Sequence, residues 1–141
     1  MQGQTQVQGI PAHGGQGEIR IFKQFMELVS QLPFNENNEF TVKLGDLEYF
    51  DGSRKIYDVE LVIRKKEYLN KTVYTMTVFY TVFTRGIPKG IVPPELIEWG
   101  HRVYMEYFLD DPRDAASLIE WERKCGLLTK AVQAINQGGG S

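Results

Sequence analysis

Residues 72–85 alternate between two kinds of side chain, and this alternation constrains the fold more than any other feature of the chain. The apolar set, which suits a core, comprises Tyr74, Met76, Val78, Tyr80 and Val82. The intervening set combines threonines with aromatic rings and comprises Val73, Thr75, Thr77, Phe79, Thr81 and Phe83. A period of two is typical of a β-strand, because successive side chains point to opposite faces of the sheet. We therefore predict a strand with one face toward a core and the other available to a partner.

Two earlier segments extend this strand into an antiparallel meander. Apolar and polar residues alternate over 40–44, and Gly45 marks a bulge, since the apolar set continues beyond it one residue out of phase. Asp51 and Gly52 tolerate the positive φ of a tight hairpin turn. A second alternating strand follows over residues 55–66. The sequence thus predicts a three-stranded antiparallel β-meander.

Helices are expected before and after the meander. Apolar residues recur at helical spacing over 18–32, and Pro33 ends that segment. Pro94 suits the first position of a second helix over 95–109, which is apolar on most of its circumference. A last helix is predicted over 111–136. The predicted class is α+β with the order α-β-β-β-α-α, because so small a sheet needs helices packed against it to be stable.

The last predicted helix carries an apolar seam that can be interpreted in two ways. Its members recur at gaps of three and four residues and include Leu118, Trp121, Leu128 and Val132. The seam either packs on its own domain or forms an oligomer interface. Because the preceding predicted helix is apolar nearly all round, we expect a homo-oligomer.

Length and composition indicate one folded domain between two tails. The chain has 141 residues, of which 42% are hydrophobic and 24% charged, and this is typical of a globular protein. We predict a flexible Gln/Gly-rich arm over 1–17, a single domain over 18–136, and a flexible tail or linker remnant over 137–141. The chain has one cysteine, no apolar run long enough for a membrane and no secretory signal, so we expect a cytoplasmic protein, or a virion protein if the source is viral.

The residues that catalysis would need are not present as a set. His13 lies in the predicted arm, His101 lies in an aromatic segment, and Cys125 lies on the apolar seam. No phosphate-binding glycine loop, nucleophile elbow or paired metal-ligand motif occurs. We therefore expect no enzymatic activity, no metal and no cofactor.

Charge is distributed unevenly and favours nucleic acid as a partner. Basic residues outnumber acidic ones over 43–89, and the reverse holds over 94–125. Aromatic rings beside cations on an open sheet form the platform that single-stranded nucleic acid uses. The candidate binding residues are Phe79, Phe83, Arg85, Arg54, Lys55, Arg64, Lys65, Lys66, Lys71 and Lys89. The sequence therefore predicts an oligomeric protein that binds single-stranded nucleic acid, with residues 86–93 as a flap.

Two alternatives account for the same residues. Phe79 and Phe83 could lie beneath a helix or another subunit, with the lysines only solvating strand edges. The chain could also be a structural or assembly subunit, viral for example, whose sheet face and tails make protein–protein contacts.

Overall fold

The computed structural model describes residues 16–85 and 98–138 and shows four strands and three helices in that part of the chain. In chain order the elements are α1 (Gln16–Val29), β1 (Glu39–Glu48), β2 (Lys55–Tyr68), β3 (Lys71–Arg85), β4 (Glu98–Phe108), α2 (Pro112–Cys125) and α3 (Leu127–Asn136). The strands form a single antiparallel sheet in the order β1-β2-β3-β4. The α+β class and the antiparallel meander are therefore confirmed.

The fourth strand corrects the predicted order, which is α-β-β-β-β-α-α. The helix predicted over 95–109 is wrong, because residues 98–108 pair with β3 from Arg85↔Glu98 to Thr75↔Phe108 without a register shift. Aromatic and β-branched residues favour a strand when a neighbouring strand is present for them to pack against. The pairing with β3 could not be read from the segment itself. Its aromatic residues occur at many positions, and this pattern by itself predicts a helix that is apolar on most sides.

The predicted last helix is two helices. Asp111 caps α2 by accepting a hydrogen bond from the Arg113 amide, with Pro112 at the first helical position. Gly126 then adopts a left-handed conformation with φ 71°, which ends α2 and precedes α3. The seam predicted over 111–136 therefore bends at this glycine.

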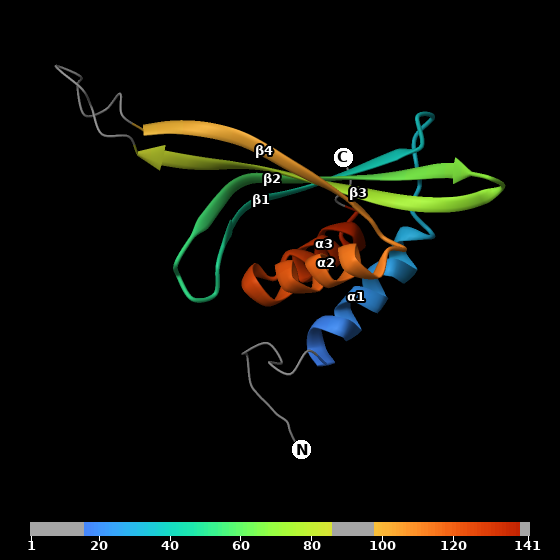
Figure 1. Ribbon diagram of the computed structural model, residues 1–141, viewed down its shortest axis with the longest axis horizontal. Coiled ribbons are helices and arrows are strands. Elements are labelled where there is room, and N and C mark those ends of the chain that lie inside the picture. The colour runs from blue at the N-terminus through green and yellow to red at the C-terminus, as the bar shows by residue number, and fades with distance from the viewer. Residues whose placement is uncertain (1–15, 86–97, 139–141) are drawn as a thin grey trace.

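All three helices pack on the same face of the sheet (Figure 1). The core between sheet and helices contains the side chains that the alternation assigned to it, among them Met76 and Val78, which are fully buried. Phe25 and Val29 of α1 and Leu118 of α2 meet them from the helical layer. In the part of the chain that the structure describes, the opposite face of the sheet carries no helix (Figure 1).

The two edges of the sheet differ. β1, at one edge, shifts register on both sides of Gly45, which has φ 75°, and this confirms the predicted bulge. β4, at the other edge, continues over 98–108 without a shift. Bulges protect an edge from pairing with further strands, so the β4 edge is the less protected of the two.

The predicted tails fall largely outside the described residues. Residues 1–15 and 139–141 lie beyond them, and so does the 86–93 connector. None of the helices within 16–85 and 98–138 combines the length and apolar character that crossing a membrane requires.

Candidate functional site

The helix-free face of the sheet carries two aromatic pairs, and this face is the candidate site. Phe79 of β3 stands opposite Tyr104 of β4, with ring centroids 5.7 Å apart. Phe83 meets the ring of Tyr57 edge to face at 4.9 Å. Tyr104 is 70% exposed and Phe83 is 49% exposed, whereas Phe79 is half-buried. The two phenylalanines predicted as binding residues alternate along β3 with the buried Met76 and Val78, so they lie on the opposite face of the sheet. Within residues 16–85 and 98–138, that face carries no helix (Figure 1).

Gly100 makes room for the Phe83 ring. The two residues are cross-strand partners, and a Cβ added at Gly100 would lie 2.9 Å from Cε1 of Phe83. An aromatic ring lying across a strand glycine shields backbone that would otherwise be exposed. Sequence reasoning missed Gly100, because it placed this residue in a helix.

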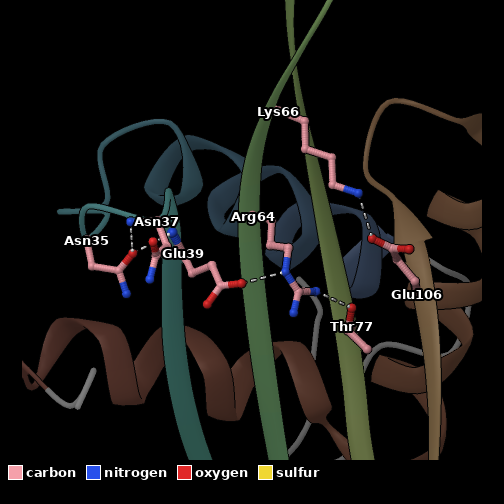
Figure 2. A network of polar contacts seen from close by, with 7 residues as sticks. All are labelled: Asn35, Asn37, Glu39, Arg64, Lys66, Thr77 and Glu106. Carbon is pink, nitrogen blue, oxygen red and sulfur yellow. Dashed lines mark hydrogen bonds and ion pairs between the residues drawn. The ribbon is translucent and has the colours of Figure 1, made fainter.

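Ion pairs neutralise two of the predicted binding cations (Figure 2). Arg64 Nε lies 2.9 Å from Glu39 Oε2, and Arg64 Nη1 donates to Thr77 Oγ1 at 3.0 Å. Lys66 Nζ lies 3.3 Å from Glu106 Oε2. These pairs connect all four strands across the open face, and their opposite charges cancel.

Arg102, which the sequence analysis did not select, lies between the two aromatic pairs. It stands opposite Thr81, and its Nη1 donates to Thr81 Oγ1 at 3.0 Å and to the Asp58 carbonyl at 2.7 Å. Its Nη2 lies 3.6 Å from Glu60 Oε1. A register shift in β2 between Tyr57 and Glu60 accompanies this arrangement. This third cation of the face is therefore also paired with an acid.

The other predicted cations do not converge on one patch. Arg54 lies over the Tyr49 ring at 5.9 Å and Lys55 over the Tyr57 ring at 5.3 Å, both near the β1–β2 hairpin. Lys65 and Lys71 are exposed near the β2–β3 hairpin, at the opposite end of the sheet. The side chain of Arg85 and the whole of Lys89 lie outside what the structure describes.

The predicted oligomer residues pack against their own chain. Leu118 and Leu128 have no exposed surface and Val132 is 5% exposed. Trp121 is half-buried, and its Nε1 donates to Tyr107 Oη at 2.9 Å. The apolar seam is thus largely covered within this chain, which favours a different surface for contact with a second subunit.

β4 provides such a surface. As the outermost strand beside β3, it leaves one side without a strand partner in the described part of the sheet. Tyr104, Met105 and Phe108 are its exposed apolar residues, at 70%, 57% and 38%. A long, regular edge strand with exposed apolar residues is a template for pairing with another strand.

Within the described residues, no group of three or more His, Cys, Asp or Glu side chains could hold a metal ion. No family model, no curated protein and no solved structure matches the chain. Its function must therefore be inferred from the geometry of the open face and of the β4 edge.

Proposed function

We propose that the chain is a non-catalytic assembly subunit that pairs with a second copy of itself along β4. The β4 edge carries this proposal, because it is regular and no described strand pairs with its outer side, although at its end the Phe108 amide donates to Asp114 Oδ2 at 2.7 Å. Two copies joined there in antiparallel fashion would merge two four-stranded sheets into one continuous sheet. The aromatic pairs of both copies would then lie on the same open surface.

The order of residues along β4 supports a two-fold axis at Tyr104. Around that centre, Arg102 of one copy would stand opposite Glu106 of the other, and Gly100 opposite Phe108. Charges of opposite sign facing each other stabilise antiparallel pairs, whereas like charges destabilise them. A ring from the second copy would also lie beside Gly100, where the Phe83 ring already packs. This edge is therefore complementary to itself.

The ion pairs of the open face also support contact with protein. Arg64, Lys66 and Arg102 each have an acidic partner within the sheet, so few uncompensated cations remain there to attract phosphate. A neutral surface with aromatic rings is typical of protein interfaces, in which aromatic residues are enriched.

Disulfide cross-linking at the proposed axis tests the pairing. Facing residues of antiparallel strands have Cα atoms about 4.5–5.5 Å apart, a distance that a disulfide can bridge. In a Cys125→Ala background, we expect Tyr104→Cys to form a cross-linked dimer on mild oxidation. Non-reducing electrophoresis would show this dimer, and sedimentation would show a dimer of the unmodified chain.

Two neighbouring variants serve as controls. Arg102→Cys and Glu106→Cys should not cross-link alone, because identical positions would lie about 14 Å apart along the strand. Mixed together, they should cross-link to each other. A monomeric mass at high concentration, together with no Tyr104→Cys dimer, would refute the proposal.

Binding of single-stranded nucleic acid is the second candidate function, and the exposed rings around Arg102 favour it. Stacking on Phe79 and Phe83 would give sequence-tolerant binding, because every base has an aromatic face. We expect Phe79→Ala and Phe83→Ala each to weaken oligonucleotide binding by roughly 1–3 kcal/mol. Fluorescence anisotropy at two salt concentrations measures this, since phosphate contacts make affinity fall with salt. If binding were absent or independent of salt, nucleic-acid binding would be rejected and assembly would be the remaining candidate function.

A further inference from the structure

A cavity of about 560 Å³ lies among the three helices and the β1–β2 hairpin, away from the open face. We propose that it binds a small organic cation, a protonated amine on an apolar body, through the carboxylate of Glu18. This site is independent of the β4 edge and of the proposed assembly.

Glu18 is the residue that points to a ligand. It lies in the first turn of α1 and lines the cavity, yet its side chain is only 2% exposed. Among the described residues, neither of its carboxylate oxygens has a hydrogen-bond partner. A buried carboxylate without donors is costly, because it has lost its hydration without gaining a hydrogen bond. A ligand with N–H donors would satisfy both oxygens.

The second acid of the cavity is already satisfied. Glu122 Oε1 accepts from the Thr129 amide at 2.8 Å, and Oε2 accepts from the Thr129 hydroxyl at 2.5 Å. Glu18 is therefore the charged acceptor that remains for a ligand among the described residues of the cavity wall. One available carboxylate suits an ammonium group better than Mg²⁺ or Ca²⁺, which require six or more oxygen ligands.

The rest of the wall fits an apolar ligand body. Ile21 of α1 and Phe50 of the hairpin line the same cavity. The Phe50 ring lies against Gly126, where an added Cβ would be 3.0 Å from Cζ, and the Phe50 amide donates to the Lys124 carbonyl at 2.9 Å. An aromatic face held in this position attracts a cation as well as an apolar group. Arg20 and Lys130 also line the cavity and would oppose a ligand with several positive charges.

A matched set of probes tests the proposal on the unmodified full-length chain. Tryptamine carries an ammonium group, tryptophol replaces it with a neutral hydroxyl, and indole-3-propionate carries a carboxylate. Titration followed by two-dimensional NMR should show tryptamine binding at least about tenfold more tightly than tryptophol, with no binding of the propionate. Contacts between tryptamine and the side chains of Ile21 and Phe50 should appear as intermolecular NOEs. No binding of tryptamine at millimolar concentration, or equal affinity for the alcohol, would overturn the proposal.

Glu18→Gln keeps the shape of the side chain and removes its charge. The variant should lose the preference for tryptamine over tryptophol, whereas Glu27→Gln, at an exposed position of the same helix, should keep it. Glu18→Gln should also raise the melting temperature, because it removes an unpaired buried charge. A lower melting temperature would show that Glu18 is paired within its own chain, and the proposal would fail.

Discussion

At the scale of single residues, two buried glutamates have opposite surroundings. Glu122 is 7% exposed, and both of its carboxylate oxygens accept hydrogen bonds from Thr129, in the first turn of α3. Gly126, which precedes α3, has no side chain to cap the helix, so Glu122 supplies the acceptor from the preceding helix. Glu18 is buried to a similar degree and has no such partner. Glu122 therefore stabilises the fold, and Glu18 is better explained by binding.

Glu122→Ala should destabilise the protein by about 1–3 kcal/mol, because it leaves the Thr129 amide and hydroxyl without their acceptor. Urea denaturation measures the loss in the free energy of unfolding. Glu120→Ala is the control, since Glu120 makes only partly exposed pairs with Arg123 and Lys124 and should cost less than about 1 kcal/mol. Equal losses in the two variants would contradict the capping role.

Cys125 makes stability depend on pH in the alkaline range. Burial raises the pKa of this thiol from its ordinary 9.0 to about 11. Between these values the unfolded chain releases the proton while the folded chain keeps it, so the free energy of unfolding falls as pH rises from about 9 to about 11. Cys125→Ala lacks this titration.

Urea denaturation at about pH 8 and about pH 10.5 should therefore show a smaller loss of stability in Cys125→Ala than in the unmodified chain. The same burial should keep the thiol unreactive toward a disulfide reagent at pH 8 until the protein unfolds. Rapid labelling of the folded protein would show that the thiol is accessible.

At the scale of elements, one glycine decides where α2 ends and α3 begins. Gly126 has φ 71°, its amide donates to the Glu122 carbonyl at 2.9 Å, and the Phe50 ring lies against it. A side chain at this position would have to adopt a strained backbone conformation and would push the ring aside. The turn thus depends on both the local conformation and the hairpin.

Gly126→Ala should lower the free energy of unfolding by at least about 1–2 kcal/mol, the cost of a left-handed conformation for a residue with a Cβ. Thermal or urea denaturation measures it. Gly138→Ala is a matched control, because Gly138 has φ 73° with nothing within 4 Å of an added Cβ and follows the last helix. Because both glycines have a left-handed φ, the comparison isolates the Phe50 contact, and equal losses in the two variants would show that this contact adds nothing to the cost.

At the scale of the whole molecule, a single layer of helices covers one face of the sheet and leaves the other open (Figure 1). On the open face, Arg64, Lys66 and Arg102 each have an acidic partner, while β4 leaves backbone groups and apolar side chains at one edge. The register shifts of β1 protect the opposite edge. If the sheet pairs with a second copy, the proposed assembly would therefore use the β4 edge rather than the β1 edge.

Met105→Lys should convert a dimer to a monomer, because it places like charges near the proposed two-fold axis and protects the edge. Its effect on the stability of the monomer should be small, about 0.5 kcal/mol or less, since Met105 is 57% exposed. Thr41→Lys, which adds the same charge to the β1 edge, should leave the mass in solution unchanged. Sedimentation of both variants compares the two edges directly, and equal masses would argue against β4 as the interface.

The meander over 39–85 could be predicted because its signals are local. The alternation of β3, the Asp51-Gly52 turn and the bulge at Gly45 each depend on residues a few positions apart, and period-two alternation specifies which side chains face the core. The same alternation placed Phe79 and Phe83 on the face that the structure leaves without helices.

Tertiary structure decided what depends on distant partners. Residues 98–108 form a strand because β3 lies beside them. The pattern of apolar residues within the segment does not by itself distinguish a strand from an apolar helix. The ion pairs of the open face are likewise long-range. Arg64 and Glu39 are 25 positions apart in the sequence, and Lys66 and Glu106 are 40 positions apart. Local chemistry thus determined the strands and turns of the meander, whereas long-range pairing determined which edge, which charges and which buried carboxylate remain available to a partner.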